Sequence, residues 1–258
     1  MYTRTPSQRE RKRKETRMQR WRPQLVMVLT IALSIILWSP HASAKLKGKW
    51  KLIKSRQGIK VYTMKVKNSP LIAVRGDAIL DAPLSKVIYL LNDVKHKTQW
   101  VDSLKKMTIV DDISATKKII YAHFALPWPA AHRDFVYDNI LRFDDKRKRI
   151  LWHSKSVKHK NAPKTVGVRA RMAYSLYILK PISNGTKTFM RAEIHGDPKG
   201  WLPAWFVNII QKGWPFKTMK GIQRALKQKW VKKHPLVVKA MKRWQKDSSP
   251  KLQAAQKK

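Results

Sequence analysis

Two stretches of this chain decide its fold: Pro127-Trp128-Pro129 followed by Arg133-Asp134-Phe135-Val136, and, further on, Asp197-Pro198-Lys199-Gly200-Trp201-Leu202-Pro203. The first leads into an alternating run that is typical of a β-strand. The second opens an amphipathic helix with Pro203 near its first turn. A strand-rich region that ends in one long helix indicates an α+β domain, in which a curved antiparallel sheet wraps around the last helix and leaves room for a cavity.

The region before these stretches predicts an opening β-hairpin and one helix. Runs at 59–62 and 71–80 are β-type and are separated by Asn68-Ser69-Pro70. Apolar residues then recur at three- and four-residue spacing, which predicts a helix near 83–94. Residues 45–57, ahead of the hairpin, are interpreted as a short basic amphipathic segment.

The middle of the chain predicts an antiparallel meander. Its β-rich segments lie at roughly 106–111, 117–126, 132–143, 148–155, 165–180 and 186–195. Asp144-Asp145 and Asn184-Gly185 mark hairpin turns, and Asn-Gly suits a two-residue turn with positive φ at both residues.

The long C-terminal helix carries one apolar stripe. The stripe consists of Trp205, Phe206, Ile209, Trp214, Phe216, Met219, Ile222 and Leu226. Gly213 and Pro215 lie inside this helix. Because an interior proline loses a backbone hydrogen bond and clashes with the preceding turn, we expect a kink or break there.

The ends of the chain are set apart from this domain. Residues 1–44 resemble a secretory signal, since a basic stretch precedes an apolar run at 25–38 and the small pair Ala42 and Ala44. The run is shorter than the roughly 20 residues of a spanning helix, so cleavage after Ala44 is favoured over an uncleaved anchor. The expected location is exported, periplasmic or membrane-associated in a bacterial envelope.

Residues 45–235 are predicted to form one domain, because no internal repeat or long linker divides them. Residues 236–258 are predicted to be a basic, disordered tail, because this end of the chain is lysine-rich and ends in polar residues that bury little surface. A monomer is expected.

The charge balance limits the partners. The chain has 57 Lys and Arg residues against 15 Asp and Glu residues, for a formal net charge of +42. Such a protein attracts polyanions, and both nucleic acid and anionic bilayers qualify. The sequence contains no cysteine, which excludes disulfides, thiolate metal sites and a cysteine nucleophile.

Five ordered matches make the chain resemble the START family of lipid-transfer domains, which have the helix-grip fold. They are Trp50 with Gly58-Ile59-Lys60-Val61-Tyr62, Arg75-Gly76, the segment 93–100, Arg133-Asp134-Phe135-Val136, and the segment 195–203. The resemblance covers about residues 48–228. It implies non-catalytic binding and transfer of one hydrophobic ligand, such as a sterol, a phospholipid or another acyl lipid, with no cofactor and no metal.

The resemblance also directs attention to cavity residues. Some sterol-binding members carry a second arginine six residues after the first, where this chain has Asn139, which weakens a sterol assignment. By strand alternation and the helix stripe, the cavity candidates are Arg133, Phe135, Tyr137, Asn139, Val168, Met172, Tyr174, Leu176, Phe206, Ile209 and Met219. Each of these could instead fill a solid core.

A docking surface for anionic membranes is expected along the last helix. Its aromatic and basic members are Trp201, Trp205, Lys212, Trp214, Lys217, Lys220 and Arg224. A solvated basic face over an aromatic core is the alternative.

Two other functions compete with lipid carriage. Glu193, His195 and Asp197 alternate onto one strand face like metal ligands, and related helix-grip folds include cyclases, so a cyclase-like or hydrolase-like enzyme is the first alternative. Charge alone supports nucleic-acid binding, but no nucleic-acid-binding motif is present and the leader indicates export, so no nucleic acid is expected.

Overall fold

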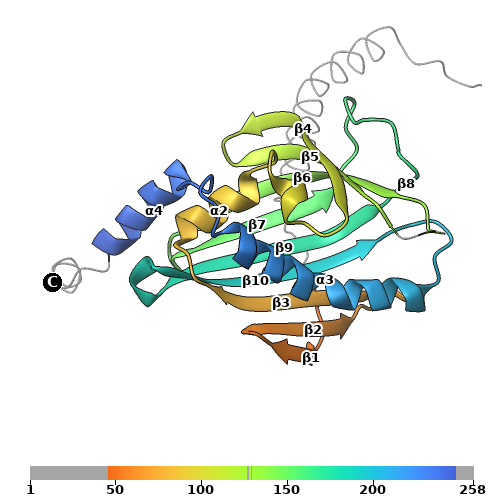
Figure 1. Cartoon of the computed structure of the whole chain (residues 1–258), viewed down its shortest axis with the longest axis horizontal. Coiled ribbons are helices and arrows are strands. Elements are labelled where there is room, and N and C mark those ends of the chain that lie inside the picture. Colours follow the sequence, from red (N-terminus) through yellow and green to blue (C-terminus); the bar gives the residue numbers. More distant parts are fainter. Residues whose placement is uncertain (1–45, 127, 129, 248–258) are drawn as a thin grey trace, which may run out of the picture. The chain divides into compact units, whose positions relative to one another are not determined.

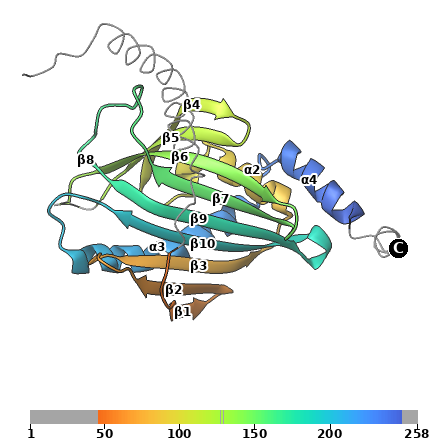
Figure 2. The same cartoon turned by 180° about the vertical axis from the view of Figure 1, so that it is seen from behind.

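The computed structural model describes residues 46–126, 128 and 130–247. The expected signal segment at 1–44 lies outside the described residues. The described residues form one compact unit. Figure 1 shows a broad sheet with its helices packed on one face, here called the inner face, and Figure 2 shows the opposite, outer face.

Ten strands form the sheet, in the order β1-β2-β3-β10-β9-β7-β6-β5-β4, with β8 beside β6. The strands are β1 (Lys51–Arg56), β2 (Ile59–Lys65), β3 (Ile72–Leu80), β4 (Leu104–Ser114), β5 (Lys117–Phe124), β6 (Arg133–Asp144), β7 (Arg149–Ser156), β8 (Val168–Arg169), β9 (Arg171–Ile182) and β10 (Lys187–Asp197). All neighbours along this order are antiparallel, and the short β8 pairs with β6 in parallel. The predicted hairpin and meander are therefore confirmed.

The helices are α2 (Leu84–Asn92), α3 (Ala204–Ala225) and α4 (Pro235–Lys246), with short 3-10 turns η1 (Lys97–Gln99) and η2 (Ser183–Gly185). Helix α3 lies against β2 and β3, and α2 lies against β9 and β10. None of the helices within the described residues combines the length and the hydropathy that a bilayer crossing requires.

The core lies between the inner face and these helices. On β3, Ala78 and Leu80 belong to the core, whereas Ile79 between them is 52% exposed on the outer face. This alternation is the period-two pattern that identified the strand from sequence. Met219 and Ile222 of α3 complete the core from the helix side and are fully buried.

Helix α3 continues through its proline. The segment is helical without interruption from Ala204 to Ala225, so the expected break at Pro215 is absent. Pro215 is buried against Gly76, where an added Cβ would lie 3.0 Å from Pro215 Cβ. Because packing on the sheet stabilises this segment, it tolerates the hydrogen bond that proline removes.

The predicted tail at 236–258 is wrong over its first part. Helix α4 occupies most of that stretch, with Val237, Ala240 and Trp244 buried on one face. Three apolar residues at helical spacing are enough to hold a short helix on an existing surface, although the segment is lysine-rich overall. Residues 248–258 lie outside the described part.

Two local predictions also change. The basic segment at 45–57 contains an edge strand, β1, whose residues are all exposed. The Asn184-Gly185 turn is longer than two residues, since Ile182 pairs with Lys187 across it. Its positive φ values, 52° at Asn184 and 84° at Gly185, agree with the prediction.

Candidate functional site

A pocket of about 380 Å³ opens at the end of the sheet where α3 begins. Three segments line it: the β2–β3 loop at 68–71, the ends of β9 and β10, and the connection into α3 with its first turns, within 198–207. These segments meet because β10 leads through a short loop into α3, which then runs back across the inner face (Figure 1). The volume lies toward the lower end of the roughly 300–1,000 Å³ typical of ligand pockets.

Charged and apolar side chains share the lining. They include Arg171, His195, Asp197 and Lys199 on the polar part and Leu71, Ala173, Leu202 and Val207 on the apolar part. The Nζ atom of Lys199 lies 2.7 Å from Oδ2 of Asp197. A lining of this composition suits an amphiphile, because it offers charge to a polar group and apolar surface to a chain.

The first half of α3, residues 204–214, borders the pocket through Ala204 and Val207 and is here called the lid segment. Its only buried residue is Val207, and Ile209 within it is 59% exposed. The second half is packed into the core through Pro215, Thr218, Met219, Gly221, Ile222 and Ala225. Gly213 and Pro215 lie where weak packing changes to tight packing, so this is the point at which the helix can bend most easily.

Two side chains of the lid segment hold it to the sheet. Asn208 accepts a hydrogen bond from the backbone N–H of Ile72 at 3.1 Å and donates one to the carbonyl of Pro70 at 3.2 Å. Gln211 donates from Nε2 to the carbonyl of Gly196 at 3.0 Å. These hydrogen bonds hold the lid segment at the pocket, and few apolar contacts add to them.

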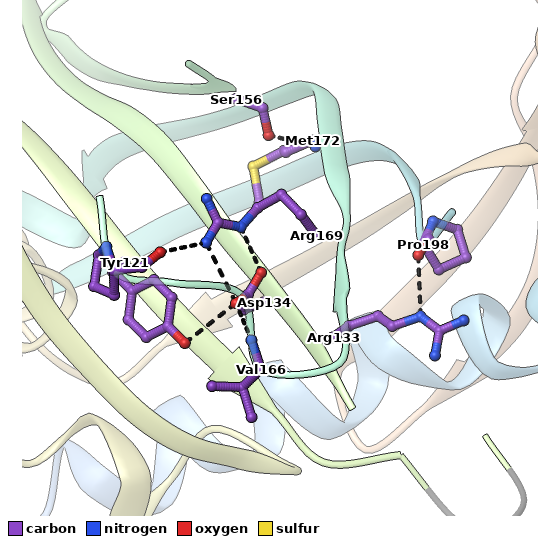
Figure 3. Close-up of polar contacts among 9 residues, drawn as sticks. Tyr121, Arg133, Asp134, Ser156, Val166, Arg169, Met172 and Pro198 are labelled. Atoms are coloured by element: carbon purple, nitrogen blue, oxygen red, sulfur yellow. Dashed lines mark hydrogen bonds and ion pairs between the residues drawn. The ribbon is translucent and has the colours of Figure 1, made fainter. Parts of the chain in front are cut away.

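Arg133 does not line the pocket, but it holds the loop that does. Its guanidinium donates to the carbonyls of Pro198 at 3.0 Å and Lys199 at 3.1 Å, and also to that of Ala131. The side chain is buried, and burial lowers its pKa. Arg133 therefore joins the loop before β6 to the loop that leads into α3 (Figure 3).

Asp134 is the centre of a hydrogen-bond network on the outer face. Its carboxylate, fully buried, accepts hydrogen bonds from the Nε of Arg169 at 2.5 Å, the backbone N–H of Val166 at 2.9 Å and the hydroxyl of Tyr121 at 3.3 Å (Figure 3). Burial, together with the nearby Asp134 carboxylate, raises the pKa of Tyr121. The network fixes the segment between β7 and β9 against the sheet.

Three further cavity candidates on β6 fill the core. Phe135 packs edge-on against Phe124, with ring centroids 5.8 Å apart. Tyr137 is buried in a second apolar cluster, where burial raises its pKa. The Oδ1 atom of Asn139 accepts hydrogen bonds from Trp152 and Ser154, and the space beside it, about 10 Å³, is too small for a lipid.

The candidates on β9 point away from the core. Tyr177 and Leu179 belong to the inner-face core, so Met172, Tyr174 and Leu176 alternate onto the outer face. Tyr174 donates from its hydroxyl to Glu193 at 3.3 Å. The expected phase was wrong because the strand is interrupted at Ala170, where β8 ends and β9 begins.

The remaining candidates lie around the pocket or in the core. Val168 lies 3.7 Å from the position of a Cβ on the pocket residue Gly200. Phe206 stacks edge-on with Trp205 at the surface, and Ile209 is exposed rather than cavity-lining. Met219 is fully buried opposite Gly76. Arg133 and Val168 lie next to residues of the pocket, but no cavity candidate lines the pocket described above.

Exposed aromatic residues gather at the pocket end. Trp128 is 93% exposed, Trp201 is 70% exposed and Trp205 is 66% exposed. Because Arg133 ties the loop that carries Trp128 to the loop that carries Trp201, we name these residues, with Ile209 and Ile210, the aromatic end. Trp128 was not among the predicted docking residues, and its position between two prolines is the signal that could have found it.

The other predicted docking residues are distributed along α3. Trp214 is half-buried, whereas Lys212, Lys217, Lys220 and Arg224 are exposed. Lys217 forms an ion pair with Asp102 at 3.0 Å. The positions suit a basic surface, and membrane docking itself stays a prediction.

The acidic and histidine residues that resembled metal ligands do not converge. A register shift between His195 and Gly196 breaks the alternation, Glu193 bonds Tyr174 on the outer face, and Asp197 pairs with Lys199 at the pocket. Among the described residues, no group of three or more metal-ligating side chains is close enough to hold an ion. Burial raises the pKa of Glu193.

Sequence reasoning missed the residues that shape the pocket. Asn208 and Gln211 looked like ordinary polar positions of an amphipathic helix, and Asn68, Ser69 and Pro70 looked like a turn. Asn208, for example, contacts residues more than 130 positions away in the sequence. No local sequence pattern reveals such a contact.

Comparison with known proteins agrees with this geometry. The family model described as START domain matches residues 43–230. The phosphatidylcholine transfer protein of Bos taurus is 24% identical over 182 residues, which cover 68% of this chain and 83% of the relative. An uncharacterised protein of Pseudomonas aeruginosa is 25% identical over 180 residues, covering 70% of this chain and 88% of the relative.

A solved structure shows the same fold. The StAR-related lipid transfer protein from Xanthomonas axonopodis superimposes with a TM-score of 0.64 and 27% identity, covering 69% of this chain and 99% of that fragment. With its antiparallel sheet, its long C-terminal helix and a family match over most of its length, this chain belongs to the START domain family.

Proposed function

We propose that this protein binds one lipid molecule at the pocket beneath the lid segment and carries it between membranes without changing it chemically. Membership of a family with lipid-transfer relatives supports this function. The observation that carries the proposal is the pocket itself, whose lining is both charged and apolar and whose cover is a poorly packed half-helix.

The energetics explain why the lid segment matters. Transfer of an acyl chain out of water is worth about 0.8 kcal/mol per CH₂, or roughly 12 kcal/mol for a sixteen-carbon tail. A bilayer already provides this stabilisation. The protein therefore needs only to match it, and its useful work is to lower the barrier to exchange. A lid segment held mainly by the side chains of Asn208 and Gln211 opens at a small cost.

The ligand class follows from the lining. Arg171 and Lys199 present cationic groups next to Leu71 and Val207. This combination favours an acyl lipid with an anionic or zwitterionic head group over a sterol, in agreement with the neutral Asn139 in place of a second arginine.

Docking to anionic membranes would take place through the aromatic end. Tryptophan prefers the bilayer interface, and Trp128, Trp201 and Trp205 surround the part of the molecule where the pocket lies. The exposed lysines Lys212 and Lys220 on the same helix add electrostatic attraction of about 1 kcal/mol each near an anionic leaflet. Insertion at this end would pull on the lid segment and bend α3 near Gly213.

Native mass spectrometry with organic extraction of the purified protein tests the function most directly. A lipid that copurifies at about one molecule per chain supports carriage. A bound metal would support an enzyme instead, and copurifying nucleic acid would support a nucleic-acid binder. Either result without lipid would contradict the proposal.

A pocket-filling variant tests the site. Ala173→Phe places an aromatic ring into the pocket lining and should abolish lipid loading and lipid transfer between vesicles. Ile79→Phe, which adds a ring at a site 52% exposed on the outer face, is the matched control and should transfer lipid normally. Equal transfer by both variants would place the ligand elsewhere.

The proposed docking surface has its own test. Trp201→Ser with Trp205→Ser should weaken sedimentation with phosphatidylglycerol-containing vesicles, and added salt should weaken the remaining binding. Sedimentation that responds neither to salt nor to anionic lipid content would contradict docking.

The cellular setting is also part of the proposal. We infer an exported protein, periplasmic or attached to an envelope membrane, because of the leader at 1–44. Cell fractionation and the N-terminal sequence of the purified protein test this, with a mature start at Lys45 as the expected result. Light scattering on a sizing column should give a monomer.

A further inference from the structure

Helix α4 lies beyond the part of the chain that matches the family. The match ends at residue 230, and α4 spans Pro235–Lys246. Its apolar residues Val237, Ala240 and Trp244 face the protein. The helix therefore adds a surface of its own to the START domain.

Three contacts fix α4 in place. The backbone N–H of His234 donates to the carbonyl of Ser85 at 2.9 Å, just before the helix begins. At its other end, Nε1 of Trp244 donates to Oδ1 of Asp145 at 2.6 Å. Between them, the terminal methyl group of Met241 lies close to the β9–β10 turn at Gly185, 3.2 Å from the position of an added Cβ. The outward face of α4 is consequently held in one orientation.

That outward face is predominantly cationic, with Gln245 as a neutral exposed residue among the basic ones. Its exposed residues include Lys239, Lys242, Arg243 and Lys246, and the preceding Lys232 and Lys233 are exposed as well. The sequence contains no acidic residue between Asp197 and Asp247. Arg243 pairs with Asp145 at 2.6 Å, whereas within the described residues no acidic side chain forms an ion pair with Lys239, Lys242 or Lys246.

The turns beside α4 extend this surface. Lys146 and Arg147 are exposed in the β6–β7 turn, next to the Asp145 that α4 contacts. Lys180 is exposed where β9 approaches the turn at Gly185. We name Lys239, Lys242 and Lys246, with these neighbours, the α4 basic face.

The α4 basic face and the aromatic end lie at opposite ends of β10. The β9–β10 turn contacts α4 at one end of the strand, and at the other end Asp197 leads into the loop of Trp201 (Figure 1). With about 3.3 Å per residue, β10 separates the two surfaces by roughly 35 Å. One flat bilayer would not readily contact both surfaces at once.

The chemistry of the two ends also differs. The aromatic end exposes indole rings that suit insertion, whereas the one tryptophan of α4 is buried and its outward face offers ammonium groups on flexible stems. Such groups suit adsorption to a charged plane without penetration, and the attraction falls off over a Debye length.

We propose that the α4 basic face is a second docking surface, specific for the charge of an anionic phospholipid bilayer, and that it lets one molecule hold two membranes at once. The choice of a bilayer as the occupant rests on the proposed lipid-carrying function. Adsorption through α4 would keep the protein on one membrane while the pocket end exchanges lipid with the other.

Vesicle clustering tests this proposal with the full-length protein. Wild-type protein should cluster vesicles containing 30% phosphatidylglycerol, as seen by dynamic light scattering, and should not cluster pure phosphatidylcholine vesicles. The variant K239Q/K242Q/K246Q should need at least a tenfold higher protein concentration to cluster the vesicles. It should still sediment with them through the aromatic end. Glutamine is used because it preserves helix propensity.

A matched control removes the same charge elsewhere. K51Q/K60Q/K65Q changes three exposed lysines of β1 and β2 and should cluster vesicles like wild type. Circular dichroism and thermal unfolding establish that both variants are folded. If the two variants lose clustering equally, net charge rather than α4 is responsible, and the proposal is overturned.

Two more outcomes decide the occupant. If the α4 variant loses binding to DNA or RNA in a gel-shift assay but clusters vesicles normally, the face binds nucleic acid and the proposal is wrong. If no lipid copurifies with wild type and the pocket-filling variant behaves normally, the lipid-carrying function fails. Clustering that still depends on α4 would then support the docking surface alone.

Discussion

Arg133 and Asp134 are consecutive residues of β6, yet their buried side chains leave opposite faces of the sheet and hold different loops. Arg133 binds the carbonyls of the loop that leads into α3, and Asp134 binds the segment that leads into β9. Strand alternation makes this division unavoidable. The first two residues of the Arg-Asp-Phe-Val motif are therefore structural anchors beside the pocket.

Arg133→Met and Asp134→Asn should have separable effects. Arg133→Met leaves the carbonyls of Pro198 and Lys199 without their donor, and we expect a loss of about 1–3 kcal/mol in the free energy of unfolding together with faster lipid exchange. Asp134→Asn breaks a buried pair with Arg169 and should cost about 3–5 kcal/mol with little change in exchange per folded molecule. Denaturant titration and a vesicle transfer assay measure the two quantities. Equal effects on exchange would contradict the division.

Two glycines of α3 provide a contrasting pair. A Cβ on Gly221 would lie 2.2 Å from the backbone oxygen of Trp100, so Gly221→Ala must displace the η1 segment or the helix and should cost about 3 kcal/mol or more. A Cβ on Gly213 would meet no atom within 4 Å, so Gly213→Ala should raise the free energy of unfolding by about 0.5–1 kcal/mol. Thermal unfolding distinguishes them.

Gly213→Ala should also slow lipid transfer. The substitution reduces backbone freedom at the junction between the lid segment and the core-packed half of α3. A more stable protein that transfers lipid more slowly would support bending at this junction. A transfer rate equal to or above that of wild type would show that the helix moves elsewhere.

Release of the lid segment should have the opposite effect on rate. Asn208→Ala removes the contacts to Ile72 and Pro70, and Gln211→Ala removes the contact to Gly196. We expect each variant to exchange lipid several-fold faster, with a stability loss of about 1 kcal/mol. Lys60→Ala, at an exposed position of β2 outside the proposed docking surface, is the control. A rate unaffected by both variants would show that the lid segment does not limit exchange.

Lys97 should give the protein a pH-dependent stability. Its Nζ is buried and donates to the carbonyls of Leu90 and Leu91, and burial lowers the pKa of Lys97 to about 7. In the unfolded chain the pKa is about 10.4, so the unfolded state binds more protons between these values. The free energy of unfolding therefore rises with pH across the window from about 7 to 10.

The matched variant isolates this contribution. Lys97→Met removes the titrating group but keeps an unbranched side chain, and the rise between pH 7 and 10 should be smaller than in wild type by roughly a few kcal/mol. Denaturant titrations at several pH values measure both curves. Parallel curves would mean that Lys97 keeps its proton up to pH 10 in the folded protein, so that burial does not lower its pKa.

Local patterns predicted most elements of the fold correctly. The alternation that identified β3 and the three- and four-residue spacing of α2 depend only on which face of an element is buried. The positive φ at Asn184 and Gly185 follows in the same way from residue type. The family was recognisable because five such local signals occur in a fixed order.

Strand phase and helix α4 required the tertiary structure. The prediction puts Met172 and Tyr174 on the wrong face because the chain breaks at Ala170, between β8 and β9, and this break changes the alternation. The sequence of helix α4 predicts a polar tail because its three buried residues stabilise a helix only when they pack against α2 and two neighbouring turns.

The amino-acid sequence by itself determined the element order, the family and the excess of positive charge, because each depends on residue type and spacing along the chain. The pocket beneath the lid segment, the separate anchors Arg133 and Asp134, and the opposed aromatic and basic ends were decided by the tertiary structure. They arise from contacts such as that of Asn208 with Pro70, between residues that only folding brings within hydrogen-bond distance.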